Sequence, residues 1–315
     1  MDTEITPGDV IRLEGLDLPP GARFHYVKNG DIKLRVMIAE PAREHPRGSI
    51  LFQPGRTEFI EKFFETIEDL TDRGFVVLVL DPRGQGLSTR LLDDPMKGWV
   101  GSFDDYCDDL AFVAGVFKND LPRPQIVMGH SMGGLVGLQT ILSGRLNPAA
   151  CVFSAPMLEL QDMSTPFMGE IVRFLSWAGM KYNHLPFQAS RSGQPGAFRV
   201  NKLTNDPNRY QLWATYFENH KRLRVGPPTF GWISQAMQAM KFVKDNAAHL
   251  KIPTLLTACG ADAIVTPASI EEFAKKAHAE FINFPGCLHE ILLEKDEFRD
   301  QFWATFDKFL EENGL

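Results

Sequence analysis

Short apolar runs alternate along this chain with segments of helical length, and this alternation limits the possible folds more than any other feature. Phe75–Leu80 is apolar throughout, as expected for a strand that is buried on both faces of a parallel sheet. Further strands are predicted at 49–53, 125–128, 149–153, 254–258 and 281–284, with helices between them and at the C-terminus. The pattern predicts an α/β fold, with a mostly parallel, doubly wound sheet covered by helices on both faces.

The alternation fails between residues 157 and 247, which contain no strand-like run. This segment has 13 aromatic residues and 11 lysines and arginines against six acidic residues, although the whole chain has a formal net charge of −7. We therefore predict a first part of the body at 1–156, a helical insert at 157–247 after the sixth strand, and a second part of the body at 248–315. An ordinary helical subdomain with a small core of its own is the alternative for the insert.

The composition excludes several classes of protein. Of the 315 residues, 44% are hydrophobic and 23% are charged, which is typical of a globular protein and not of a disordered or repetitive chain. The longest unbroken apolar run has six residues, whereas a membrane-spanning helix needs about 20, so no such helix is expected. The acidic net charge argues against a general nucleic-acid-binding protein.

The N-terminus and the cysteines predict a cytoplasmic location. Residues 1–4 lack the basic start and the apolar core of a signal peptide. The four cysteines lie far apart in the sequence, without a C-x-x-C pair: Cys107, Cys151, Cys259 and Cys287. This pattern predicts reduced and mostly buried thiols.

A G-x-S-x-G motif at 129–133 carries the strongest functional signal. It directly follows a predicted strand and precedes a predicted helix, which is the setting of a nucleophile elbow. In such an elbow Ser131 occupies a strained turn, so side chains at Gly129 and Gly133 would collide with neighbouring backbone. The N-terminus of the following helix directs N–H groups at a developing oxyanion. We predict that Ser131 is a nucleophile; the alternative is that it only caps the helix.

A serine nucleophile needs a base, and His289 is the predicted one. It lies in the loop after the last predicted strand, at the edge where a parallel sheet presents its ligands. We expect the turn to direct His130 away from Ser131, and His278 falls within a predicted helix. Asp262, in the loop after the preceding strand, is predicted to hold the imidazole of His289. The alternatives are a loop histidine that caps a helix and an aspartate that only forms a turn.

The segments around Ser131, Asp262 and His289, together with two segments that precede them in the chain, resemble the α/β-hydrolase group of monoacylglycerol lipases and bacterial lysophospholipases. The likeness is greatest to members of the lysophospholipase L2 type. The resemblance rests on QPGRTE at 53–58, DPRGQGLS at 81–88, GHSMGG at 129–134, GAD at 260–262 and HE at 289–290. It fades in the insert, where such families place a cap over the active site. It implies an α/β-hydrolase fold and an oxyanion hole made by the backbone N–H groups of Arg56 and Met132. Monoacylglycerol lipases usually have His-Gly where this chain has Pro54-Gly55, so the lysophospholipase-like members match best.

The leading hypothesis is a serine ester hydrolase that cleaves a long-chain acyl ester through an acyl-enzyme and uses no cofactor and no metal. Residues 289–293 begin like a zinc-binding motif but have Leu293 where the second histidine belongs. The aromatic, basic insert suits an acyl chain and an anionic head group or membrane surface. The expected partners are therefore a small acyl ester, with lysophospholipids among the candidates, and a membrane contacted peripherally through the cap. The basic residues could instead balance the acidic body.

Three other functions stay open. The first is a general carboxylesterase, and the second is a non-catalytic ligand-binding member of the fold. The third is an aminopeptidase, which needs a carboxylate in the insert to bind the free amine of its substrate. The carboxylates available there are Glu159, Asp162, Glu170, Asp206, Glu218 and Asp245.

Overall fold

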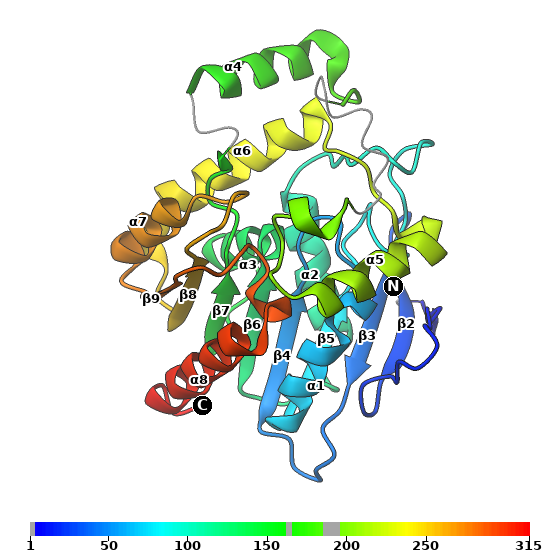
Figure 1. Ribbon diagram of the computed structural model, residues 1–315, viewed down its shortest axis with the longest axis vertical. Coiled ribbons are helices and arrows are strands. Elements are labelled where there is room, and N and C mark those ends of the chain that lie inside the picture. The colour runs from blue at the N-terminus through cyan, green and yellow to red at the C-terminus, as the bar shows by residue number, and fades with distance from the viewer. Residues whose placement is uncertain (1–3, 162–165, 185–195) are drawn as a thin grey trace.

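The computed structural model describes residues 4–161, 166–184 and 196–315, which form one nine-stranded sheet flanked by helices (Figure 1). The strands are β1 (Ile5–Pro7), β2 (Arg23–Asn29), β3 (Ile32–Ala39), β4 (Gly48–Gln53), β5 (Phe75–Leu80), β6 (Gln125–His130), β7 (Ala150–Ser154), β8 (Thr254–Cys259) and β9 (Glu280–Phe284). Their order is β1-β2-β3-β5-β4-β6-β7-β8-β9. Three neighbouring pairs are antiparallel, namely β1–β2, β2–β3 and β3–β5. The other five pairs, from β5–β4 to β8–β9, are parallel. The predicted mostly parallel α/β sheet is confirmed.

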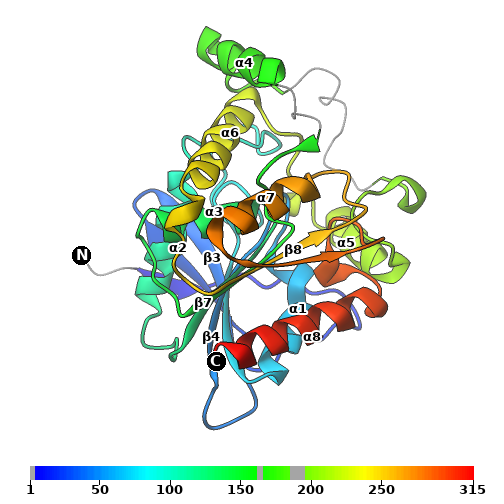
Figure 2. The ribbon, with the colours of Figure 1, turned by 90° about the vertical axis from the view of Figure 1, so that its left-hand side faces the viewer.

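Helices cover both faces of the sheet (Figure 2). The α-helices are α1 (Phe64–Asp72), α2 (Asp104–Val116), α3 (Met132–Leu142), α4 (Pro166–Leu175), α5 (Pro207–Asn219), α6 (Phe230–Asp245), α7 (Pro267–Ala277) and α8 (Asp296–Glu312). The short helical turns are η1 (Ile60–Phe63), η3 (Ser176–Met180), η4 (Phe198–Val200), η5 (Lys221–Leu223), η6 (Ala247–His249) and η7 (Ile291–Leu293). One apolar core lies between the sheet and α1 and α8, and another lies between the sheet and α2, α3 and α7.

β5 shows how the sheet separates these two cores. Val77 and Val79 belong to the core under α1 and α8, while Val76 and Leu78 belong to the core on the other face. Successive side chains of a strand point to opposite faces, so a strand between two helical layers must be apolar throughout. This is the reason for the continuous run that the sequence shows at this position.

The helical insert lies between β7 and β8, so it follows the seventh strand and not the sixth as predicted. α6 contributes Trp232, Ile233 and Met240 to the same core as α2 and α3. α5 contributes Tyr216 and Phe217 to a smaller cluster with body residues. α5 and α6 therefore pack against the body instead of around a core of their own, while α4 packs on α6 at the outer end of the molecule (Figure 1).

Two further expectations concern the cysteines and the membrane. All four cysteines are buried and free, as predicted. Among the residues that the structure describes, no helix is both long enough and apolar enough to span a bilayer.

Candidate active site

Ser131 lies between β6 and α3 in a strained backbone conformation, with φ 52° and ψ −117°. A positive φ is rare for a residue with a β-carbon and costs on the order of 1–3 kcal/mol. The turn is held on both sides, because the N–H of Ser131 donates to the Ser154 carbonyl at 3.0 Å and its carbonyl accepts from the N–H of Met157 at 2.9 Å. These backbone hydrogen bonds thus hold Ser131 in its strained conformation, as the elbow prediction requires.

The two glycines of the motif allow the backbone to approach closely. A β-carbon at Gly133 would lie 1.9 Å from the carbonyl oxygen of Gln53, and one at Gly129 would lie 2.7 Å from the carbonyl carbon of Gly133. Both distances are shorter than any real contact, so the elbow needs glycine at both positions. The contact with Gln53 also shows that the end of β4 lies directly against the elbow.

The structure brings Ser131, His289 and Asp262 together at the carboxyl edge of the sheet. The Oγ atom of Ser131 lies 2.9 Å from Nε2 of His289, and Nδ1 of His289 lies 2.6 Å from Oδ2 of Asp262. The three come from the ends of β6, β8 and β9, and all three are buried. The side chains predicted to be the nucleophile, the base and the group that orients the base are therefore joined in one chain of hydrogen bonds, with His289 in the middle.

The surroundings of Asp262 favour its ionised form. Burial alone would raise the pKa of this carboxyl, but the hydrogen bond and charge interaction with His289 and the N–H groups of Ile264 and Val265 outweigh it, so the pKa is lowered. These N–H groups donate to Oδ1 at 2.7 and 3.0 Å, which leaves Oδ2 for the imidazole. An ionised carboxylate is thereby fixed against Nδ1 of His289.

The two backbone N–H groups predicted for the oxyanion hole lie on segments that flank the elbow. Met132 is the first residue of α3, where the N–H has no acceptor within its own helix. Arg56 follows β4, and a β-carbon on the preceding Gly55 would lie 3.2 Å from the His130 carbonyl oxygen. The guanidinium of Arg56 extends to α6, where it lies 5.2 Å from the Trp232 ring centroid. Burial lowers the pKa of this guanidinium to about 10.

Of the three histidines considered from the sequence, His289 is the one whose ring contacts Ser131 Oγ. His278 ends α7 in a left-handed conformation. Nδ1 of His130 lies 3.1 Å from Oγ of Ser154, and its ring packs against that of His289 with centroids 4.8 Å apart. Burial and the nearby His289 lower the pKa of His130 to about 3. A group that binds a proton so weakly is a poor general base at neutral pH.

Sequence reasoning missed a buried cluster next to these residues. Glu58, Lys62 and Glu290 meet there, and their side chains are at most 7% exposed. Ligand atoms of Glu58, His130 and Glu290 lie within 4.8 Å of one another, as in a metal site, but the Lys62 ammonium already contacts both carboxylates. The i, i+4 spacing of Glu58 and Lys62 and the position of Glu290 directly after His289 were the available signals.

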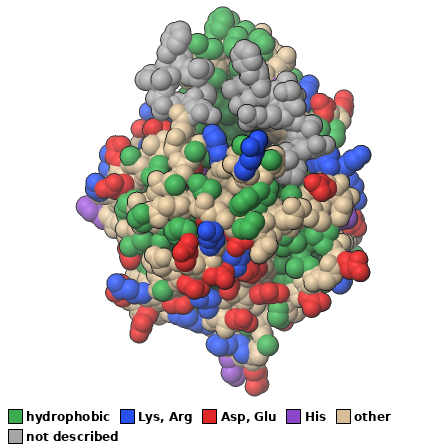
Figure 3. Space-filling view, in the orientation of Figure 1, with side chains coloured by type: hydrophobic (Ala, Val, Ile, Leu, Met, Phe, Trp, Pro, Cys, Tyr) green, Lys and Arg blue, Asp and Glu red, His purple; other side chains and the backbone are tan. Residues whose placement is uncertain are grey.

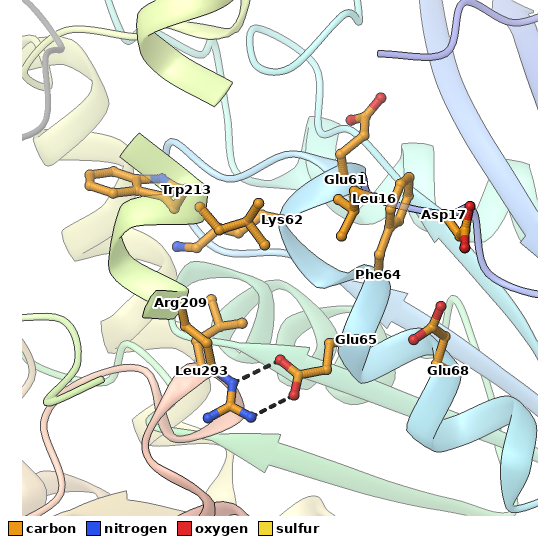
Figure 4. Close-up of a pocket in the computed structure, with 11 residues that line it drawn as sticks. Leu16, Asp17, Glu61, Lys62, Phe64, Glu65, Glu68, Arg209, Trp213 and Leu293 are labelled. Atoms are coloured by element: carbon orange, nitrogen blue, oxygen red, sulfur yellow. Dashed lines mark hydrogen bonds and ion pairs between the residues drawn. The ribbon is translucent and has the colours of Figure 1, made fainter. Parts of the chain in front are cut away.

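A pocket of about 350 Å³ lies away from Ser131, between α1 and α5 (Figure 4). Its lining residues include Glu65 and Arg209, which form an ion pair across it, and Leu16 and Trp213. Ser131, Asp262 and His289 do not line it. We therefore do not assign it to the candidate active site.

Comparison with known proteins identifies the family. Residues 44–296 match the family described as "Serine aminopeptidase, S33". The chain belongs to this family. Its fold is accordingly that of the α/β hydrolases, as the resemblance implied.

Several known proteins are similar to this one over most of the chain. Lysophospholipase L2 of Escherichia coli K12 is 32% identical over 299 residues, which cover 90% of this chain and 86% of the relative. Monoacylglycerol lipase of Mycolicibacterium smegmatis is 23% identical, over 80% of this chain and 84% of the relative. A crystal structure of a soluble variant of monoglyceride lipase from Saccharomyces cerevisiae aligns with a TM-score of 0.73 at 19% identity, covering 96% of this chain and 98% of that chain. The predicted resemblance to lysophospholipases and monoacylglycerol lipases is confirmed.

Proposed function

We propose that this protein is a serine ester hydrolase that cleaves the acyl ester of a lysophospholipid or a monoacylglycerol. The observation that carries the proposal is the chain of hydrogen bonds from Ser131 Oγ through the imidazole of His289 to Asp262, with distances of 2.9 and 2.6 Å. The strained turn at Ser131 and the lowered pKa of Asp262 support it.

The proposed reaction has two halves. Ser131 Oγ attacks the acyl carbonyl carbon while Nε2 of His289 takes the hydroxyl proton, and Asp262 stabilises the imidazolium. The N–H groups of Met132 and Arg56 stabilise the tetrahedral oxyanion. The intermediate collapses to an acyl-enzyme when His289 returns the proton to the leaving alcohol. Water, deprotonated by His289, then attacks the acyl carbonyl carbon of the acyl-enzyme. As the bond to Ser131 Oγ breaks, His289 gives this proton to Oγ, and the fatty acid and free Ser131 are released.

The substrate class rests on the relatives and on the insert. Relatives covering most of the chain are named lysophospholipase L2 and monoacylglycerol lipase. The insert supplies aromatic and methionine side chains, which adapt to a flexible acyl chain. We place the acyl chain under the insert at 157–247, acting as a cap, and the glycerol-linked head group at its opening.

We further propose that the insert touches a membrane surface. Apart from Ile5, every large apolar side chain that is exposed in the described residues belongs to the insert: Phe174, Trp177, Met180, Tyr182, Phe198, Val200 and Phe242. Trp177 is 82% exposed, and its ring lies 6.1 Å from that of Phe174. Apolar side chains are visible at this outer end of the molecule, over α4 (Figure 3). We keep the cytoplasm as the proposed location, because four free, buried thiols suit a reducing compartment.

An aminopeptidase, the activity in the family's description, has less support. Four candidate carboxylates of the insert pair with basic side chains of the chain itself: Glu159 with Lys244, Glu170 with Arg173, Asp206 with Arg209 and Asp245 with Lys241. Asp162 lies outside the described residues, and Glu218 is exposed on α5. Carboxylates that already have a cation are poorly suited to bind a substrate ammonium.

Two measurements test the proposed function. A fluorophosphonate probe should label the wild-type protein at Ser131, and Ser131→Ala should not be labelled. A hydrolysis screen should compare a lysophospholipid, a monoacylglycerol of the same acyl chain and an aminoacyl amide, and we expect turnover of the two lipids. Equal labelling of wild type and Ser131→Ala would end the assignment of the nucleophile, and turnover of the amide alone would favour the aminopeptidase.

A further inference from the structure

A buried lysine joins two carboxylates behind the candidate active site. Nζ of Lys62 lies 3.0 Å from Oε1 of Glu58 and 2.6 Å from Oε1 of Glu290, and the three side chains are only 2–7% exposed. Lys62 and Glu61 are neighbours in η1, yet their side chains extend in different directions (Figure 4). Glu61 pairs with the buried Arg35, whereas Lys62 extends past Trp213 with its ammonium 5.4 Å from the ring centroid.

One end of this cluster holds the loop proposed to carry an oxyanion donor. The second carboxylate oxygen of Glu58 accepts a hydrogen bond from the N–H of Gly55, the residue before Arg56. A β-carbon at Gly55 would lie 2.8 Å from that oxygen, so the carboxylate sits directly on the loop. Glu58 Oε1 is also 3.8 Å from Nε2 of His130, whose ring packs on that of His289.

The other end holds the loop of His289. Glu290 directly follows His289, and its N–H donates to the Leu203 carbonyl at 2.8 Å. Lys62 therefore joins two segments separated by more than 220 positions in the sequence, namely the loop after β4 and the loop after β9. These loops carry one proposed oxyanion donor and the proposed base.

A gain in fold stability is a weak explanation for a cluster of buried charges such as this one. Burial lowers the pKa of the Lys62 ammonium, but Glu290 and Glu58 outweigh burial and leave the pKa raised. The lysine is thus charged, and the cluster has one cation for two carboxylates. Removing such charges from water is unfavourable, and well-packed apolar residues often stabilise a fold as well or better. A cluster of this cost is better explained by the geometry that it imposes.

We propose that Lys62 is a positioning residue, which aligns the Gly55–Arg56 loop with His289 by holding Glu58 and Glu290 together. The inference rests on the proposed function of Ser131 and His289. Lys62 itself touches no reacting atom. Its effect is on the transition state, where the oxyanion donor and the imidazolium must be in place simultaneously.

The test uses Lys62→Met, which replaces the lysine with an unbranched, uncharged side chain only one atom shorter. This substitution leaves two buried carboxylates without a cation, and the variant could therefore fail to fold. The double variant Lys62→Met/Glu290→Gln, which leaves one such carboxylate, is measured as well, and it tests the inference if the single variant does not fold. The matched control is Arg299→Met. Arg299 is another buried cation that bridges two carboxylates, Glu65 and Asp69, but it joins α8 to α1.

Kinetic constants are expressed per active site, counted by fluorophosphonate titration, so that loss of folded protein does not enter. We expect kcat to fall about 10- to 100-fold in the Lys62 variants with little change in KM, as for a misplaced oxyanion donor. The dissociation constant of a trifluoromethyl ketone, which forms a tetrahedral adduct with a serine nucleophile, should rise by about the same factor as kcat/KM falls. Arg299→Met should lower the melting temperature without either change.

The outcomes are distinguishable. If the wild type is labelled and active while both Lys62 variants match Arg299→Met in kcat and in ketone affinity per site, the inference is wrong and the proposed function stands. If kcat falls but the ketone binds as tightly as to the wild type, the positioning role is also wrong. If the wild type itself is neither labelled nor active, the proposed function fails and takes the inference with it.

Discussion

The imidazole rings of His130 and His289 pack against each other with centroids 4.8 Å apart, although only His289 contacts Ser131 and Asp262. His130 is held by Ser154, and burial and His289 lower its pKa to about 3. A neutral ring can lie next to an imidazolium without repelling it, so His130 supports the orientation of His289 without competing for the proton.

The two histidines should therefore differ strongly on substitution. His289→Ala should lower kcat by about 10⁴-fold or more, because proton transfer and imidazolium stabilisation are lost together. His130→Asn, which can still bond to Ser154, should lower kcat by only about tenfold, through looser packing. Steady-state kinetics of the two variants on one monoacylglycerol decide the matter, and a larger loss in His130→Asn would reverse the assignment of the base.

Asp262→Asn should reduce kcat on the order of 10⁴-fold, because an amide cannot stabilise the imidazolium and favours the wrong tautomer. The lowered pKa of Asp262 also predicts a pH effect on stability. A carboxyl whose pKa is depressed by folding stabilises the native state above its unfolded pKa of about 3.9, and this contribution is lost as the pH falls through the lower native value.

Urea unfolding of wild type and Asp262→Asn at a series of pH values measures this contribution. The difference in the free energy of unfolding should be constant from neutral pH to about pH 5 and should shrink only below about pH 4. A difference that grew towards low pH would contradict the direction of the pKa shift.

Acyl-chain length should control the reaction rate on neutral esters. Each buried methylene contributes about 0.8 kcal/mol, so four extra carbons should raise kcat/KM by roughly two orders of magnitude until the pocket is full. Because apolar contact is not screened, this profile should persist in added salt, and an anionic head group should add only a modest, salt-sensitive gain. A series of glycerol esters from acetyl to decanoyl tests this, and equal rates at both ends would replace the lipid hydrolase with a general carboxylesterase.

The exposed aromatic residues of the insert should bind vesicles. Trp177→Ser should weaken sedimentation with anionic phospholipid vesicles about tenfold or more, because burying a large apolar side chain contributes about 1.5–3 kcal/mol. Ile5→Ser serves as the control, since Ile5 is also exposed but lies in β1, outside the insert. Equal binding of wild type, Trp177→Ser and Ile5→Ser would remove the membrane contact from the proposal.

Arg35→Met should destabilise the fold by about 3–5 kcal/mol, because it leaves buried carboxylates without their cation. Arg35 is fully buried between Glu61 and Asp81, at 2.6 and 2.8 Å. Arg23→Met removes an exposed ion pair to Glu40 and should cost only about 0–1 kcal/mol. Urea denaturation of both variants compares them, and similar losses would show that burial does not set the cost here.

Much of the sheet could be predicted because most of its strands are short apolar runs that can be recognised in the sequence. β5 was predicted with its observed ends, since a strand between two helical layers is a continuous apolar run. β2 and β3 were not predicted, because β3 contains the charged Arg35, which is buried only through partners from other segments. The contacts among Ser131, His289 and Asp262 were predictable because parallel strands bring their carboxyl ends to one edge. Their catalytic roles and that of Arg56 stay predictions.

The α/β class, the elbow at Ser131 and the loops that carry Asp262 and His289 could all be inferred from the order of residues along the chain. These features depend on periodicity, on glycine at two positions and on strand order, all of which are readable along the chain. By contrast, the packing of α6 into the core of the body and the position of Lys62 between Glu58 and Glu290 became visible only in the folded chain. The physical reason is that a charge can be buried only where distant segments supply its partners, and no local pattern records which segments will meet.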